Sequence, residues 1–203
     1  MAVVHAVVQA AALALAAAAA QAQPQMPQPA PGPEACTACH GPGGNSQVAT
    51  MPSIAAQPRT FLENQLVLIR EGLRDVPAMK AVMGSLSDEQ IVALAKHFSA
   101  LPALPAVAAL SALAAPGEPQ PAKLRAGAAL SQRGLCGSCH LPGYVGQSQV
   151  PRLAGQQEAY LATTLKMYRD APDPGRDTAM SGVLRGLQDA DLANLAHYFA
   201  NAK

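Results

Sequence analysis

Apolar residues recur with helical spacing in two stretches that lie far apart along the chain. In each stretch three apolar residues stand at i, i+4 and i+7: Leu62, Leu66 and Ile69, then Leu161, Leu165 and Tyr168. This spacing places the three side chains on one face of an α-helix. Other residues match between the two stretches: Pro52 with Pro151, Gln57 with Gln156, Phe61 with Tyr160, and Arg70 with Arg169. The pattern predicts two copies of one helical unit.

A second helix is predicted at the end of each unit. Ser87 followed by Gln90 forms a capping-box signature, and Asp189 and Asp191 favour a helix start through the helix dipole. The apolar stripes that follow are Ile91, Leu94, Ala95 and Phe98, then Leu192, Leu195, Ala196 and Phe199. No alternating pattern of strand length occurs, so the sequence predicts an all-α fold.

Proline-rich segments separate the units. Residues 101–121 contain five prolines and predict a Pro/Ala-rich linker at 102–121, with helical turns within Ala106–Ala115. A helix is expected over Lys123–Ser131. Residues 23–35 also carry five prolines and are expected to form an extended or disordered tail without a regular helix. The units themselves are assigned to residues 36–101 and 122–203.

Residues 1–22 are almost entirely small or apolar and end in Ala20-Gln21-Ala22. An apolar stretch before an A-x-A site is typical of a secretory signal peptide, so cleavage after Ala22 and export to the periplasm are expected. The alternative is an uncleaved anchor that holds the protein at the membrane. No later stretch is apolar enough to span a bilayer, and no stable membrane insertion is expected after cleavage.

Composition narrows the function. The formal net charge is +1, which argues against a nucleic-acid partner because phosphate binding requires a basic excess. The chain has three Phe, four Tyr and no Trp, which is little bulk for two small cores. A large cofactor would supply the missing bulk.

All four cysteines stand in two Cys-x-x-Cys-His motifs, "CTACH" from Cys36 and "CGSCH" from Cys136. This spacing is the attachment signal for c-type haem, because two thiols about a turn apart add to the porphyrin vinyl groups and the adjacent histidine reaches the iron. A four-thiolate zinc site or two local disulfides would leave the histidines without a role. We therefore expect two covalently attached haem c groups on these residues: Cys36, Cys39 and His40, then Cys136, Cys139 and His140.

The sixth iron ligand is expected from each unit separately. Met79 and Met180 are the only two methionines that coincide when the units are aligned. A Met thioether opposite a His raises the reduction potential. His97 and His197 are not equivalent, so bis-His ligation is the weaker alternative and both are expected to be exposed helix residues. Two other methionines are matched by leucines and are expected to serve packing: Met83 and Met167.

Pro52 and Pro151 follow the motifs at matching positions. A backbone carbonyl near each could accept the N–H of the ligating imidazole and raise its basicity. The alternative role is that of a tight-turn proline.

The matching segments "CTACHGPGGNS", "MPSIAAQ", "MKAVMGSLSDEQIVALAKHF" and their second copies resemble class I cytochromes c, and specifically the dihaem cytochrome c4 family. The resemblance implies two tandem class I cytochrome c domains, each with one haem, and electron transfer in the bacterial periplasm. It places His40 and Met79 on one iron and His140 and Met180 on the other. An N-terminal helix typical of such domains is missing before Cys36, so the linker or the second unit is expected to cover Phe98.

With both axial positions filled, no site remains for a substrate, so the sequence predicts an outer-sphere electron carrier and not an enzyme. Its expected partners are a dehydrogenase or quinol-oxidising complex as donor, and an oxidase or another cytochrome as acceptor. The alternatives are a cytochrome subunit of a dehydrogenase complex and, in an enzyme class, a dihaem peroxidase or thiosulfate-oxidising cytochrome.

The two halves of the chain differ slightly in charge. Residues 34–105 carry five basic and six acidic side chains, and residues 118–203 carry nine basic and seven acidic side chains. This mild dipole could orient docking, or could be an ordinary solvated surface.

Overall fold

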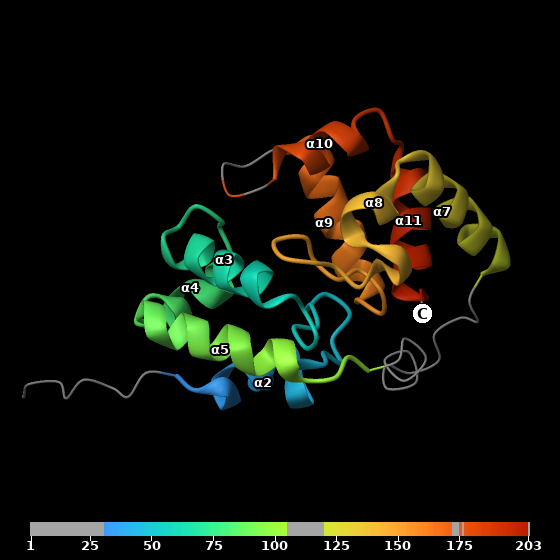
Figure 1. The fold of residues 1–203 in the computed structure, drawn as a ribbon. Coiled ribbons are helices and arrows are strands. Elements are labelled where there is room, and N and C mark those ends of the chain that lie inside the picture. The colour runs from blue at the N-terminus through green and yellow to red at the C-terminus, as the bar shows by residue number, and fades with distance from the viewer. Residues whose placement is uncertain (1–30, 105–119, 172–174, 176, 203) are drawn as a thin grey trace, which may run out of the picture. The chain divides into compact units, whose positions relative to one another are not determined.

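The computed structural model describes residues 31–104, 120–171, 175 and 177–202. Within these ranges the chain is helical, with two short 3-10 turns and one isolated bridge between Gln147 and Val150 (Figure 1). The all-α prediction is therefore confirmed. The expected signal peptide at 1–22 and the expected helical turns within Ala106–Ala115 lie outside the described residues.

The repeat predicted from the sequence is visible in the order of the elements. The first unit contains α2 (Pro33–His40), the 3-10 turn η2 (Pro42–Gly44), α3 (Arg59–Arg70), α4 (Pro77–Met83) and α5 (Asp88–Ala100). The second contains α7 (Pro121–Arg133), α8 (Cys136–His140), the turn η3 (Pro142–Tyr144), α9 (Glu158–Asp170), α10 (Thr178–Leu184) and α11 (Asp189–Ala200). The helix expected over Lys123–Ser131 is present within α7.

Each unit is built on its last helix. In the first, α5 packs against α3; in the second, α11 packs against α9 and α7. The apolar stripes predicted for α5 and α11 are buried along their full length. Ser87 and Gln90 form the predicted capping box at the start of α5, and the Asp191 carboxylate accepts the Gln188 N–H at the start of α11.

Helix α2 begins at Pro33, inside the segment that was expected to be extended. The expectation was wrong for residues 33–35 because proline is tolerated in the first helical turn, where its missing N–H has no intrahelical partner to lose. Glu34 then stands in the first turn, where an acidic side chain interacts favourably with the helix dipole.

Helix α7 lies directly against α11 at Gly127. A Cβ at this position would stand 2.2 Å from the Asn194 carbonyl oxygen and 2.4 Å from Tyr198 Cβ. Both distances are far below a van der Waals contact, so the close approach of the two helices requires glycine here. In the part of the chain that the structure describes, no helix precedes α2 in a corresponding place on α5.

Phe98 is nevertheless buried in the first unit, with 3 % of its surface exposed. The turn at Gly44 covers it, because a Cβ on Gly44 would stand 2.8 Å from Phe98 Cδ1. The start of the linker is fastened beside this turn: Asn45 Nδ2 donates to the Pro102 carbonyl and Asn45 Oδ1 accepts the Leu104 N–H. The cover is thus mainly the unit's own loop.

Among the described residues, no helix is both long enough and apolar enough to cross a membrane.

Candidate haem-binding sites

Both Cys-x-x-Cys-His motifs lie in short helices, the first at the end of α2 and the second forming α8. The four cysteines are free thiols. His40 and His140 are the last residues of these helices, and both are buried. Each motif therefore presents one half-buried thiol, one exposed thiol and a buried imidazole.

The two histidines are held in the same way. His40 Nδ1 donates to the Pro52 carbonyl and His140 Nδ1 donates to the Pro151 carbonyl, each across 2.8 Å. A carbonyl can only accept, so each proton sits on Nδ1 and the Nε2 lone pair is available to a metal. This is the ligand geometry and outer hydrogen bond expected for a haem histidine. The carbonyl that was expected to accept the imidazole N–H near each proline is the carbonyl of the proline itself.

Burial shifts the pKa values of one motif histidine and of the first cysteine in each motif. It lowers the pKa of His140, opposed by the hydrogen bond to Pro151, and so favours the neutral ligand form. It also raises the pKa of the Cys136 thiol, and with the Glu34 carboxylate it raises that of Cys36. A redox-active Cys-x-x-Cys pair depends on a lowered thiol pKa, and burial shifts the pKa of Cys36 and Cys136 in the opposite direction.

The zinc alternative has no support in the geometry either. Among the residues that the structure places, no three His, Cys, Asp or Glu side chains gather in a cluster that could hold a metal ion.

A cavity of about 230 Å³ lies next to the second motif. It is lined mainly by apolar side chains from α7, α10, α11 and the adjoining turns, together with Cys136: Leu130, Arg133, Gly134, Val183, Leu184, Leu187 and Leu195. A porphyrin is a flat apolar group that joins to the thiol of such a motif, so the residues present fit a haem. Met180 packs against the same core.

Met79 lies in α4 and Met180 in α10, the equivalent helix of the second unit, and both side chains are half-buried. Met83 is a core residue, as predicted. Met167 is 39 % exposed, so the expectation that it serves core packing was wrong. It stands on the outer side of α9, whose inner face is already filled by Leu161 and Leu165.

The two remaining histidines differ in environment. His97 is exposed, as predicted, but His197 is buried, which corrects the expectation that it is exposed. The His197 Nε2 atom accepts the Gln120 N–H, and Nδ1 lies 2.9 Å from a Glu158 carboxylate oxygen. Its two partners come from the residue before α7 and from the start of α9.

Arg70 and Arg169 stand at matching positions of the repeat, but their structural role was not predicted from the sequence. Arg169 Nη1 donates to the Leu187 carbonyl and Nη2 pairs with Asp189, each within 2.8 Å. Arg70 makes the same two interactions with the Leu86 carbonyl and Asp88 in the first unit. Each arginine thus ties the end of α3 or α9 to the loop that follows the methionine helix.

We expect Arg169→Met to loosen the segment that carries Met180. The substitution removes the hydrogen bond to Leu187 and the ion pair with Asp189 while keeping an apolar stem. In the haem-loaded protein, the absorption band that reports sulfur bound to ferric iron should disappear from one haem at a lower temperature than in the wild type. Arg185→Met removes the same charge from an exposed place in the same loop and should leave this temperature unchanged; equal losses would contradict the role of Arg169.

Family models match both halves of the chain. The model described as cytochrome c oxidase, cbb3-type, subunit III, matches residues 33–97, and the model described as cytochrome c matches residues 124–203. Two cytochrome c domains, each with a Cys-x-x-Cys-His motif and a positioned histidine, define a dihaem c-type cytochrome. The protein carries two covalently attached haem c groups and transfers electrons.

Full-length relatives narrow the class. The chain is 31 % identical to the cytochrome c4 of Stutzerimonas stutzeri, over 80 % of this chain and 82 % of that protein. It is 33 % identical to a thiosulfate dehydrogenase electron acceptor of Thiomonas intermedia (strain K12), over 83 % and 79 %. The crystal structure of reduced cytochrome c4 from Pseudomonas stutzeri aligns with a TM-score of 0.72 and 30 % identity, covering 83 % of this chain and 94 % of that one. The chain belongs to the cytochrome c4 family.

Proposed function

We propose that this protein is a periplasmic electron shuttle that accepts electrons from a dehydrogenase and delivers them to a terminal oxidase or another cytochrome. A thiosulfate dehydrogenase is the donor to test first, because a relative of near-equal length is named as the acceptor of such an enzyme. Export is supported by the signal-like segment at 1–22. A quinol-oxidising complex is the other donor consistent with the family.

The observation that supports the proposal is that His40 and His140, and likewise Met79 and Met180, occupy equivalent places in the two units. Both histidines have Nε2 free for iron, and both methionines stand at the same place in their units. A haem c ligated by His and Met supplies one-electron exchange at the iron and leaves no open position for a substrate. This arrangement supports transfer in place of catalysis.

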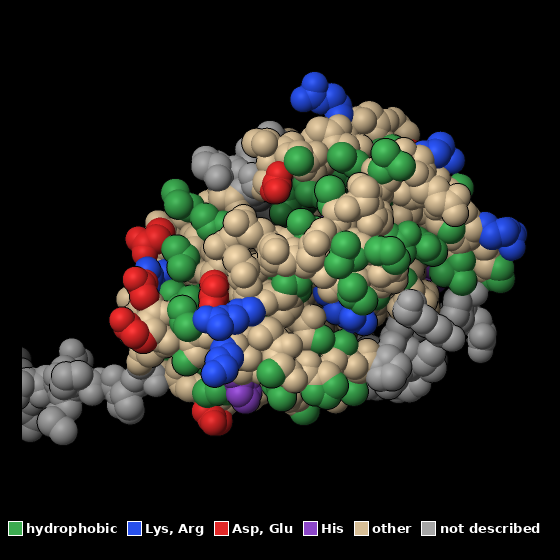
Figure 2. Space-filling model, viewed as in Figure 1, with side chains coloured by type: hydrophobic (Ala, Val, Ile, Leu, Met, Phe, Trp, Pro, Cys, Tyr) green, Lys and Arg blue, Asp and Glu red, His purple; other side chains and the backbone are tan. Residues whose placement is uncertain are grey.

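The surface offers places for a partner to approach. Leu135 and Val183, beside Cys136, are exposed, and Val82 is exposed at the position that corresponds to Val183. In Figure 2 the visible acidic side chains collect mostly over the helices of the first unit, while basic side chains stand singly over the second. These exposed apolar side chains, with charged side chains around them, suit brief, salt-sensitive encounters with a redox partner.

Mixing the oxidised holoprotein with a thiosulfate dehydrogenase and thiosulfate tests the proposal. We expect both haems to become reduced, as followed by absorbance, at a rate that falls as ionic strength rises. Thiosulfate without the dehydrogenase should reduce neither haem.

Two results would contradict the shuttle. Reduction by thiosulfate alone would indicate a thiosulfate-oxidising enzyme, and turnover of hydrogen peroxide with a high-spin ferric spectrum would indicate a peroxidase. If the dehydrogenase does not reduce the haems but a quinol-oxidising complex does, the electron donor is a quinol-oxidising complex and not a thiosulfate dehydrogenase.

A further inference from the structure

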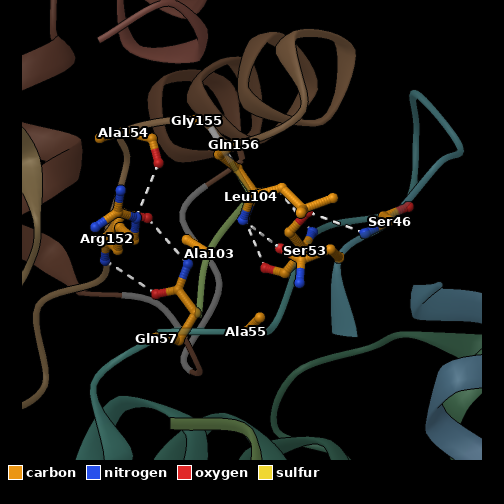
Figure 3. Close-up of a pocket in the computed structure, with 11 residues that line it drawn as sticks. Ser46, Ser53, Ala55, Gln57, Ala103, Leu104, Arg152, Ala154, Gly155 and Gln156 are labelled. Atoms are coloured by element: carbon orange, nitrogen blue, oxygen red, sulfur yellow. Dashed lines mark hydrogen bonds between the residues drawn. The ribbon is translucent and has the colours of Figure 1, made fainter. Parts of the chain in front are cut away.

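Two buried glutamines at equivalent positions of the repeat each bind the backbone of the other unit (Figure 3). Gln57 Oε1 accepts the Arg152 N–H at 2.9 Å, and Gln57 Nε2 donates to the Arg152 carbonyl at 3.0 Å. Gln156 makes the same two bonds with Ser53: Oε1 accepts the Ser53 N–H at 2.7 Å, and Nε2 donates to the Ser53 carbonyl at 2.8 Å. Each amide therefore satisfies both backbone groups of one residue in the opposite unit.

The N–H bound by Gln156 belongs to the peptide group that holds a haem histidine. The Ser53 N–H and the Pro52 carbonyl are the two ends of one peptide, and this carbonyl accepts the proton of His40 Nδ1. A continuous chain of hydrogen bonds thus runs from His40 in the first unit to Gln156 in the second.

The second unit has the reciprocal arrangement. The Arg152 N–H, bound by Gln57, shares a peptide with the Pro151 carbonyl that accepts His140 Nδ1–H. Neither crossing contact touches the haem motif of the unit that contributes the glutamine.

Hydrogen bonds in such a chain polarise one another. An N–H that donates to a glutamine oxygen leaves more negative charge on the carbonyl of the same peptide, so this carbonyl becomes a better acceptor. A better acceptor for Nδ1–H makes the imidazole a more basic ligand. A more basic ligand favours ferric over ferrous iron and therefore lowers the reduction potential.

We infer that Gln57 and Gln156 are positioning residues for the haem of the opposite unit, and that each lowers the potential of that haem. The inference rests on the proposed function in one respect, the ligation of iron by His40 and His140. Its consequence is crossed: a change in the first unit alters the second haem, and a change in the second unit alters the first.

Gln57→Met and Gln156→Met test this in the haem-loaded protein, because methionine keeps the side-chain length and removes the amide. Redox titrations followed by absorbance should show a raised midpoint for the second haem in Gln57→Met and for the first haem in Gln156→Met. The other haem should keep its wild-type midpoint in each case. Each midpoint is assigned to a haem by repeating the titration in a Met79→Ala background, which should shift the midpoint of the first haem only.

Gln157→Met is the matched control. Gln157 is also buried and crosses between the units, with Nε2 donating to the Ser46 carbonyl at 2.7 Å, but it does not bind the peptide that holds a histidine. Loss of this contact also removes a connection between the units, and it should leave the difference between the two midpoints unchanged.

The outcomes separate the possibilities. A shift in the haem of the same unit, equal shifts of both haems, or shifts that Gln157→Met reproduces would overturn the inference in favour of a merely structural role. If a variant fails to fold, hydrogen exchange in the wild type decides: the Ser53 and Arg152 amides must both be protected. If Met79→Ala moves no midpoint, the proposed ligation by Met79 fails, whatever the glutamine variants show, and the same titration in a Met180→Ala background then assigns the midpoints.

Discussion

We expect Met180→Ala to remove from one of the two haems the absorption band that arises from sulfur bound to ferric iron, and to lower the reduction potential of that haem. Met79→Ala should do the same to the other haem. A thioether stabilises ferrous iron relative to the water or nitrogen ligand that would replace it. The fall should be on the order of 0.1 V, within the roughly 0.8 V range over which axial ligands set haem potentials.

The helices that carry these residues explain why the two substitutions act separately. Met180 is in α10 and packs against the core of the second unit, whereas Met79 is in α4 of the first. Each methionine thus belongs to the unit whose haem it is proposed to ligate. Absorbance spectra and redox titrations of the two single variants measure the effect.

Met167→Leu is the control for loss of a thioether that binds no haem. Met167 is 39 % exposed on α9, and its counterpart in the first unit is Leu68. Both haem spectra should remain unchanged. If Met180→Ala and Met79→Ala also leave the spectra unchanged, the axial assignment is wrong.

Gly127→Val should unfold or strongly destabilise the second unit. The Asn194 carbonyl would lie 2.2 Å from the new Cβ, and backbone cannot move aside as a flexible side chain would. Helix α7 would have to leave α11, which would expose the apolar side chains between them, including Leu130. We expect a loss of at least about 3 kcal/mol in the free energy of unfolding, a large part of the 5–15 kcal/mol that is typical of a domain.

The measurement can be directed at the second unit because all four tyrosines lie in it. Tyrosine circular dichroism during denaturant unfolding therefore follows mainly this unit, with Tyr160 also in contact with Arg74 of the first. Gly182→Ala is the matched control: a Cβ there meets nothing within 4 Å, and alanine is the better helix former by about 1 kcal/mol. A Gly127→Val protein as stable as the wild type would show that the two helices do not pack this closely.

The helices were predictable because their signals are local. The apolar stripes of α5 and α11 and the capping box at Ser87 depend on residues within a few positions of each other. The start of α2 was missed because a proline-rich segment was expected to exclude helix, although Pro33 occupies a first-turn position that proline tolerates. Local rules therefore indicated the longer helices, but they did not predict the short helices α4, α8 and α10 and they missed the start of α2.

The environment of individual polar residues was not predictable in this way. His197 and His97 look alike in the sequence, yet only His197 is buried, where it bonds to Gln120 and Glu158. Arg70 and Arg169 were seen to match, but their carbonyl partners lie 16 and 18 residues away and meet them only after packing. The same is true of the cover that Gly44 provides for Phe98.

The sequence by itself determined that this is a twofold repeat of helices with a Cys-x-x-Cys-His motif in each copy, because the chemistry of haem attachment is written in five adjacent residues and helical periodicity in a few turns. Only the tertiary structure decided which carbonyl holds each histidine and that Gln57 and Gln156 reach into the opposite unit. Those contacts join residues up to 103 positions apart. Their partners are selected by the packing of the whole chain, which no short pattern encodes.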